Sequence, residues 1–313
     1  MTKMKIGIIG CGNISPAYLN YLDNSDVVEV YALADLLPEK AHKRAKEYGI
    51  ANVCTVEEML EHKEIGLILN LTIPSSHAAV NYAVLDHGLI GKPVAATAFM
   101  MGAGPEGWHP NPEFFYTAGG GPMFDMGPYY LTTLVQLVGP IRRISGSAGS
   151  NVPERIVQSG LRAGTVIPVS TPTHYSGTLD FVSGVIGTLV TSFDIPGGST
   201  LPWIEIYGTA GTLLVPDPNT FDGDVKIRRY DSEEWEIVPP VFNGGPNDRG
   251  RGIEDMVRAI SEERDHRASG LVAYHVLEAM HAFETSSREG RHVELTSAEM
   301  LVKKSQNLVL TTN

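Results

Sequence analysis

The most informative pattern in the chain is the stretch Lys5-Ile-Gly-Ile-Ile-Gly10-Cys-Gly12-Asn-Ile-Ser15. An apolar strand runs into a turn with two glycines, and a helical spacing of apolar residues follows over 14–22. This pattern is typical of the phosphate loop of a dinucleotide-binding βαβ unit. Gly10 permits the tight turn, Gly12 lets the backbone approach a pyrophosphate, and the third position packs the helix against the strand. Here the third position is Ser15, which is small but is not glycine.

The second expected strand, 27–34, ends at Asp35, which lies 23 residues after Gly12. That spacing is near the one expected of a carboxylate that binds the adenosine ribose, and a carboxylate repels a 2′-phosphate. Leu36 and Leu37 follow and supply no cation, so the pattern favours NAD over NADP. The residues expected to bind the cofactor together with Asp35 are Gly10, Gly12, Asn13 and Ile14. The alternative is a tight turn beside a solvated carboxylate.

Strand and helix patterns alternate over the first 90 residues, which indicates parallel βαβ units. The expected strands are 3–9, 27–34, 51–54 and 65–71, and the expected helices are 14–22, 38–48, 56–60 and 75–86. In an open parallel sheet, ligands bind beyond the carboxyl ends of the strands. Thr72, Pro74 and His77 follow the fourth strand, so we expect them to line the cofactor. For His77, a surface position in the first turn of a helix is an equal alternative.

The pattern changes after residue 91 to strands at hairpin spacing, which predicts an antiparallel sheet. The expected strands are 93–101, 142–149, 174–181, 185–193, 203–207, 212–215, 225–230 and 235–238. Helices are expected at 123–137, 252–263 and 270–289, after a loop rich in glycine and proline at 102–122. We therefore predict two domains: a dinucleotide-binding domain over 1–91 and a substrate and oligomerisation domain over 92–313.

Composition excludes several classes of protein. The chain has 313 residues and a net charge of −12, which makes nucleic acid and anionic membranes poor partners. The longest apolar run, 65–73, is too short to span a bilayer, which needs about 20 residues. Two cysteines are too few for a disulfide scaffold, and no signal-peptide pattern follows the N-terminus. We expect a cytoplasmic protein.

Taken together, the motifs resemble the glucose–fructose oxidoreductase, inositol dehydrogenase and rhizopine-catabolism (Gfo/Idh/MocA) family. The matching pieces keep the family order: 5–14, Ala34-Asp35, 72–77, Gly119-Gly-Gly-Pro-Met-Phe-Asp125-Met-Gly127 and Tyr207-Gly-Thr-Ala-Gly-Thr212. The resemblance implies a Rossmann domain joined to a domain with a large antiparallel sheet, which often forms the oligomer interface. It also implies transfer of a hydride between NAD or NADP and a carbinol carbon of a sugar, cyclitol or related polyol.

One departure from the family is the missing Glu-Lys-Pro motif, whose lysine is a principal catalytic residue in relatives. The chain has four expected parallel strands where a full dinucleotide fold has six, so two βα units of about 50 residues in all are absent from this sequence. Lys92-Pro93 follows Gly91 and not glutamate. Lys92 is therefore either a substitute catalytic residue or an exposed lysine at the start of a strand.

The second departure is Tyr129, which stands four residues after Asp125 where most relatives have histidine. A carbinol must lose a proton as its hydride leaves. Asp125 and Tyr129 are spaced i, i+4 and share a helix face, so Tyr129 is expected to pass the proton and Asp125 to orient the substrate or Tyr129. The alternatives are helix capping for Asp125 and a core position for Tyr129.

Trp108 and His109 precede this helix and are candidates to bind a sugar, Trp108 by stacking and His109 by hydrogen bonding. Both could equally pack a loop braced by prolines. No metal-binding motif is present in the sequence. Two other functions stay open: a redox-neutral, NAD-dependent glycoside hydrolase, and a non-catalytic protein that senses NAD or a sugar. In each case we expect a homo-oligomer formed through the sheet.

Overall fold

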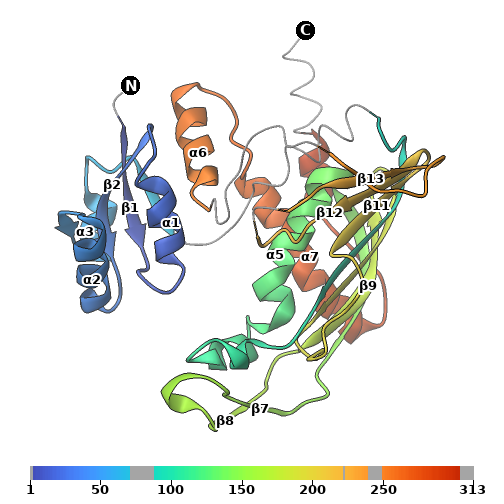
Figure 1. The fold of residues 1–313 in the computed structure, drawn as a ribbon, viewed down its shortest axis with the longest axis horizontal. Helices are drawn as coiled ribbons and strands as arrows, with labels where there is room; N and C mark the ends of the chain where they lie inside the picture. The colour runs from blue at the N-terminus through green and yellow to red at the C-terminus, as the bar shows by residue number, and fades with distance from the viewer. Residues whose placement is uncertain (1–2, 71–87, 221–222, 239–248, 304–313) are drawn as a thin grey trace. The chain divides into compact units, whose positions relative to one another are not determined.

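The computed structural model describes residues 3–70, 88–220, 223–238 and 249–303 (Figure 1). The chain forms two compact units. The first unit consists of 1–76, 220–222 and 243–269, and the second of 77–219, 223–242 and 270–313. The first unit is thus discontinuous in sequence, since it takes in a segment that follows the strands of the second.

The first unit contains a four-stranded sheet in the order β3-β2-β1-β4. Its strands are β1 (Met4–Ile9), β2 (Val28–Ala34), β3 (Asn52–Val53) and β4 (Leu67–Asn70). All neighbouring pairs are parallel, as the alternating pattern predicts. Ile9 pairs with both Ala34 and Asn70, so β2, β1 and β4 end at the same end of the sheet. That end is where the glycine loop begins.

Among the described residues, four helices accompany this sheet: α1 (Ser15–Leu22), α2 (Pro38–Tyr48), α3 (Val56–Glu61) and α6 (Arg251–Ser261). Gly49 ends α2 with φ +67°, and a capping box between Thr55 and Glu58 begins α3. Val257 of α6 is buried with Leu19 and other apolar residues of α1 and the sheet. Burial of this apolar face holds the late helix against the first unit.

The second unit is built on a nine-stranded sheet in the order β14-β13-β12-β11-β5-β10-β9-β6-β15. The strands are β5 (Pro93–Met101), β6 (Ile141–Gly149), β9 (His174–Phe181), β10 (Ile186–Ser192), β11 (Ile204–Gly208), β12 (Gly211–Val215), β13 (Lys226–Arg229), β14 (Glu236–Ile237) and β15 (Val293–Glu294). The expected antiparallel pairing needs one correction, since β5 lies parallel to β10. β5 enters between β10 and β11 as the central strand, so these two strands do not form a hairpin.

Two long helices, α5 (Gly121–Val138) and α7 (Gly270–Glu289), cover the same face of this sheet (Figure 1). The ring of Phe283 in α7 packs against Gly146 of β6 and Gly177 of β9, where the lack of side chains makes room for it. A Cβ atom at these positions would lie 2.6 and 2.7 Å from the ring. Leu131 and Leu134 of α5 are fully buried in the same core. The sheet and the two helices thus form a rigid support for the residues at the start of α5.

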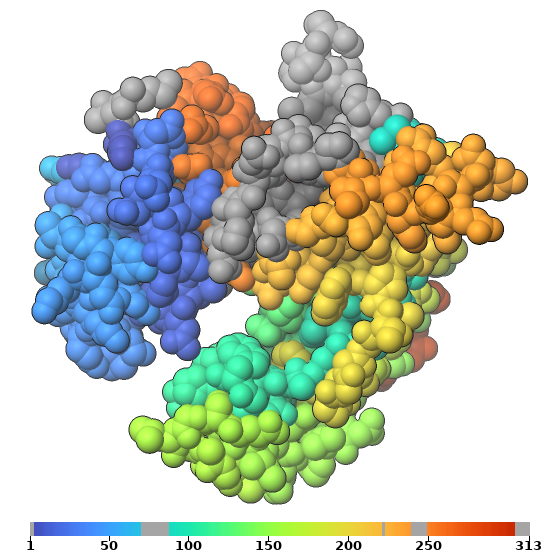
Figure 2. All heavy atoms as spheres, viewed as in Figure 1, coloured from blue at the N-terminus to red at the C-terminus, as the bar shows by residue number. Residues whose placement is uncertain are grey.

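The segment expected to be a plain loop, 102–122, contains two short 3₁₀ helices, η1 (Pro105–Gly107) and η2 (Pro112–Tyr116). A separate hairpin of β7 (Glu154–Ile156) and β8 (Val166–Pro168), with η3 (Gly160–Arg162) between them, lies beside it. The Gln158 N–H donates to the Glu106 carbonyl at 2.9 Å, and the two segments form adjoining surfaces in Figure 2. Sequence patterning missed this hairpin because its strands are only three residues long.

No helix within the described ranges is long and apolar enough to cross a membrane.

Candidate functional site

The loop between β1 and α1 has the geometry of a pyrophosphate site. Gly10 adopts φ +98°, and its N–H donates to the Ala34 carbonyl at 2.9 Å. A Cβ atom at Gly12 would meet open space, so a ligand can approach the backbone there. Within the described residues, the backbone N–H groups of Gly12, Asn13 and Ile14 have no hydrogen-bond partner, and all three residues are exposed. Free N–H groups at the start of a helix suit an anion.

Asp35 is held beside this loop by two backbone hydrogen bonds. The Cys11 N–H donates to Asp35 Oδ2 at 2.7 Å, and the Leu37 N–H donates to Asp35 Oδ1 at 2.9 Å. A carboxylate has about four acceptor positions, so two stay available for ribose hydroxyls. Leu36 is 94% exposed and places an apolar side chain where a 2′-phosphate would need a cation. These residues therefore fit NAD.

We expect Asp35→Ala to weaken NAD binding by about tenfold or more, because hydrogen bonds to a charged acceptor contribute roughly 1.5–3 kcal/mol each. The variant should also discriminate less between NAD and NADP, since the repulsion of the 2′-phosphate is lost. Calorimetric titration with both nucleotides measures the two effects. Glu29→Ala removes an exposed carboxylate from the same strand and serves as the control. Tighter binding of NADP than of NAD by the wild type would contradict this role of Asp35.

Three expected cofactor residues lie outside the described part of the chain: Thr72, Pro74 and His77. Their role stays a prediction.

The glycine run before α5 allows a close approach between backbones. A Cβ atom at Gly120 would lie 2.6 Å from the Phe114 carbonyl oxygen. One at Gly121, which adopts φ +78°, would lie 2.5 Å from the Pro172 carbonyl oxygen. Larger residues at either position would push the start of the helix away from η2 and from the segment before β9. The run therefore sets the position of Asp125, one turn further along the helix.

Asp125 does not cap α5, which begins after Gly120 with no side-chain cap. The capping interpretation of Asp125 is therefore wrong. Its carboxylate is partly buried and has no hydrogen-bond or ion-pair partner among the residues that the structure describes. Burial raises the pKa of Asp125 from 3.8 to about 6. A carboxyl group with a pKa near the working pH can accept or donate a proton.

Tyr129 lies one turn after Asp125 on the same helix, half-buried at the edge of the core. The next residue, Tyr130, differs from it in environment. Tyr130 is fully buried, donates its hydroxyl to Asp217 Oδ1 at 3.1 Å, and has its pKa raised by burial. Tyr130 is thus a structural tyrosine, whereas Tyr129 is the one that shares a helix face with Asp125.

Lys92 is exposed at the start of β5. Its N–H donates to Thr209 Oγ1 and its carbonyl accepts from the Thr209 N–H, both at 3.0 Å. The start of α5 lies near the other end of β5. Gly121 approaches Pro172, which lies just before β9. His174, the first residue of β9, pairs with Ser192 of β10, which in turn pairs with Met101 at the end of β5. A nine-residue strand spans about 30 Å. Lys92 therefore stands far from Asp125 within this unit.

Trp108 and His109 differ in how they are packed. Trp108 is 65% exposed and touches the rings of His109 and Phe115 only edge-on, at 5.4 and 6.1 Å between centroids. The His109 ring packs against Phe114 and Phe115, and its Nδ1 accepts from the Asn111 N–H at 3.1 Å. The loop-packing interpretation thus fits His109. Trp108 presents a ring face on which a sugar could stack.

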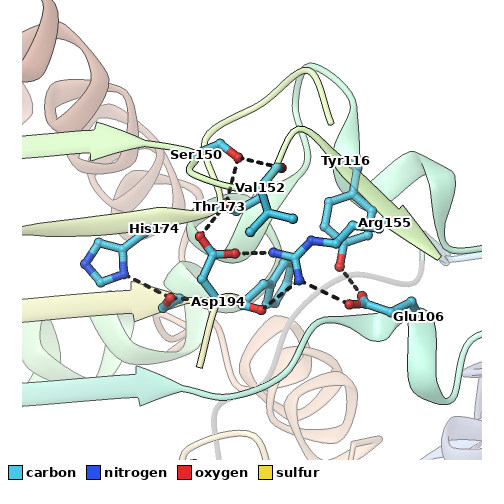
Figure 3. A network of polar contacts seen from close by, with 10 residues as sticks. Glu106, Tyr116, Ser150, Val152, Arg155, Thr173, His174 and Asp194 are labelled. Atoms are coloured by element: carbon cyan, nitrogen blue, oxygen red, sulfur yellow. Dashed lines mark hydrogen bonds and ion pairs between the residues drawn. The ribbon is translucent and has the colours of Figure 1, made fainter. Parts of the chain in front are cut away.

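Beneath this aromatic loop lies a buried ionic network that sequence reasoning missed (Figure 3). Arg155 Nη1 donates to Glu106 Oε1 at 3.2 Å, and Arg155 Nη2 pairs with Asp194 Oδ1. The Tyr116 hydroxyl donates to Glu106, and Thr173 Oγ1 donates to Asp194 Oδ2 at 2.8 Å. The members come from η1, η2, β7 and the loops beside β9 and β10. No local pattern joins residues so far apart in sequence.

Within the described ranges, no group of three or more His, Cys, Asp or Glu side chains is arranged to hold a metal ion. His275 is fully buried, where its Nε2 accepts from the Ile141 N–H at 3.0 Å and its Nδ1 bonds Ser297 Oγ at 2.6 Å. His275 thus has a structural role.

A parallel sheet with a glycine-rich phosphate loop and an acidic residue after the second strand defines a dinucleotide-binding protein. The chain belongs to the Gfo/Idh/MocA oxidoreductase family, as its sequence motifs predict. The family model for the NAD-binding Rossmann fold matches residues 4–101, and the model for the GFO/IDH/MocA C-terminal domain matches residues 82–214. The family model describes an NAD-binding Rossmann fold, which confirms the expected NAD cofactor. The preference for NAD over NADP that Asp35 indicates stays a prediction.

Solved structures share this fold at low sequence identity. Levoglucosan dehydrogenase in complex with NADH and L-sorbose is 17% identical, with a TM-score of 0.77 over 95% of this chain and 100% of that one. An NAD-binding oxidoreductase from Klebsiella pneumoniae has the same identity, coverage and TM-score. An oxidoreductase from Agrobacterium radiobacter, in complex with NAD⁺, L-tartaric acid and magnesium, is 14% identical, with a TM-score of 0.73 over 96% and 100% of the two chains. No curated protein matches the chain.

Proposed function

We propose that the protein is an NAD-dependent dehydrogenase that oxidises a carbinol carbon of a sugar, cyclitol or related polyol. The observation that carries this proposal is the partly buried Asp125, whose pKa lies near 6, on the helix that follows the family's glycine run. Membership of the oxidoreductase family supports the redox chemistry. Levoglucosan dehydrogenase, which shares the fold and whose complexes contain levoglucosan and L-sorbose, supports the substrate class.

The reaction requires that the hydroxyl proton and the carbinol hydride both leave the substrate, forming a carbonyl. Bound NAD supplies the hydride acceptor. Asp125 accepts the hydroxyl proton in its ionised form, which dominates above pH 6. Tyr129, one turn away on the same helix face, hydrogen-bonds the reacting oxygen and relays the leaving hydroxyl proton to Asp125. Trp108 offers its exposed ring to an apolar face of the sugar.

The proposal is tested by incubating the protein with NAD and a panel of sugars and cyclitols, including levoglucosan, while following the absorbance of NADH. A dehydrogenase produces NADH in proportion to the oxidised product. A redox-neutral glycoside hydrolase would cleave a glycoside with no net NADH, and a sensor would bind NAD without turnover. Either of these two results would overturn the proposal.

We expect Tyr129→Phe to lower turnover by roughly 10²–10⁴-fold, which is the usual contribution of a positioned proton donor or acceptor. NAD affinity should stay within about twofold, because a hydroxyl at the reacting oxygen is not required for binding the pyrophosphate. Tyr130→Phe is a matched control, since its hydroxyl bonds Asp217 inside the protein. That control should affect stability and leave turnover close to the wild-type value. Full activity of Tyr129→Phe would make Tyr129 a packing residue.

We also propose that the sheet face opposite α5 and α7 associates with a second copy of the chain. Within the described residues this face has no covering helix (Figure 1). On its central strands Ala95, Phe99 and Val190 share the face with Thr97 and Thr188. An uncovered sheet face that carries apolar side chains is a common site of association between protein molecules. Sedimentation at micromolar concentration should show a dimer or larger species, which Val190→Glu should dissociate. A wild type that sediments only as a monomer would contradict the proposal.

Cys11 and Cys54 are free thiols. Free thiols suit a reducing compartment, so we propose that the protein is cytoplasmic.

A further inference from the structure

An arginine from α2 reaches the back of the phosphate loop. Arg44 Nε donates to Ser15 Oγ at 3.1 Å, and Arg44 Nη2 lies 3.5 Å from the Gly12 carbonyl oxygen. The Ser15 hydroxyl in turn donates to the same Gly12 carbonyl at 2.8 Å. These three contacts close a ring of hydrogen bonds between α2, the start of α1 and the loop.

This ring lies where the chain departs from the dinucleotide fingerprint. The third fingerprint position, usually glycine, is Ser15, whose side chain is fully buried. A buried hydroxyl needs partners, and here the Gly12 carbonyl and the Arg44 guanidinium supply them. The side chain of Arg44 is only 20% exposed, and its third nitrogen, Nη1, pairs with Glu47 at 2.5 Å. The guanidinium is thus fixed in place and is not free to follow a ligand.

The consequence concerns the direction of the loop N–H groups. Arg44 and Ser15 both donate to the Gly12 carbonyl oxygen, which fixes the peptide plane between Gly12 and Asn13. The N–H groups of Gly12, Asn13 and Ile14 stay exposed and have no partner within the described residues. A loop already held in one conformation loses less entropy when an anion binds.

We propose that Arg44 is a positioning residue for the pyrophosphate of bound NAD, acting through Ser15 and the Gly12 carbonyl. In the usual fingerprint, a glycine at the third position lets the helix pack directly against the strand. Here the Ser15 hydroxyl and the Arg44 guanidinium connect the loop to α2 instead. The proposal rests on the NAD binding of the family and does not depend on the proposed sugar chemistry. Failure of the sugar assay would therefore not contradict the role of Arg44. Likewise, wild-type NAD affinity of the Arg44 variants would not contradict the sugar chemistry.

The experiment measures dissociation constants of NAD and ADP-ribose by calorimetry. Arg44→Met should weaken both ligands by the same factor, about tenfold, since ADP-ribose keeps the pyrophosphate and lacks the nicotinamide. Arg44→Lys keeps the charge and loses the planar fork, so its affinity should fall close to that of Arg44→Met. Lys43→Met removes a neighbouring, exposed positive charge from the same helix and should stay within about twofold of the wild type.

A double-mutant cycle separates positioning from a general structural effect. In a Ser15→Ala background the hydroxyl through which Arg44 acts is gone, so Arg44→Met should add less than about threefold. Circular dichroism verifies the fold of each variant. If Arg44→Met does not fold, the dissociation constants of Arg44→Lys are used for the test instead. Wild-type affinity of Arg44→Lys or Arg44→Met would overturn the proposal. So would equal losses for Lys43→Met and Arg44→Met, or a loss confined to NADP.

Discussion

Replacing Asp125 by Asn is expected to lower turnover by roughly 10²–10⁴-fold and, at the same time, to stabilise the fold at neutral pH by about 2 kcal/mol. The two effects have one cause, which is the burial of an ionised carboxylate without a described partner. An amide of the same shape cannot accept the substrate proton, but it is also not penalised for carrying a buried charge. Removal of a catalytic group often stabilises a protein for this reason.

The pH dependence of this stabilisation follows from the direction of the pKa shift. The pKa of Asp125 is raised from 3.8 to about 6, so the folded state binds a proton more tightly than the unfolded state. The stability gained from protonation is fully present below about pH 4 and is lost as the pH rises through 6. Asp125→Asn should therefore melt above the wild type at pH 8, and the difference should vanish near pH 4.

Thermal denaturation from pH 4 to 8 measures the effect, with Asp231→Asn as the control at an exposed carboxylate of the same unit. In the wild type, sugar oxidation should accelerate as the pH rises through about 6, because the ionised form of Asp125 accepts the proton. An Asp125→Asn variant that melts below the wild type at pH 8 would show that the carboxylate has a stabilising partner instead.

Arg155→Met is expected to produce the largest loss of stability, about 3–5 kcal/mol, because it leaves Glu106 and Asp194 buried without their cation. The side chains of all three residues are close to nine-tenths buried, so water cannot replace the lost interactions. For a chain of this size the loss corresponds to a fall in Tm of about 10 °C. Urea denaturation and thermal melting both measure it.

Two further variants make this prediction specific. Arg142→Met breaks an exposed pair with Asp180 and should change the free energy of unfolding by less than about 1 kcal/mol. Adding Glu106→Gln and Asp194→Asn to Arg155→Met removes the uncompensated charges and should recover a substantial part of the loss. Arg155 Nε already lacks a partner in the network, so the ionic arrangement is not optimal for stability. An unchanged Tm for Arg155→Met alone would contradict this account.

Local patterns in the sequence predicted the first unit well. A glycine turn, a following helix and a carboxylate at the end of the next strand are all short-range features, and the hydrogen bond from Cys11 N–H to Asp35 joins two of them. The bounds of α7 also follow from local patterning, with the helix spanning Gly270–Glu289 as expected. In the second unit, the expected strands lie within one or two residues of their predicted bounds, but β7, β8 and β15 were not predicted, and neither was the parallel placement of β5.

Spacing along the chain was enough to predict the phosphate loop, the carboxylate beside it, the two-part architecture and the family. Three other properties depend on contacts between distant segments of the folded chain: the raised pKa of Asp125, the Arg155 network and the ring of contacts around Arg44. A pKa depends on how completely distant segments exclude water, and an ion pair depends on which loops the fold brings together. Neither quantity is encoded in the order of neighbouring residues.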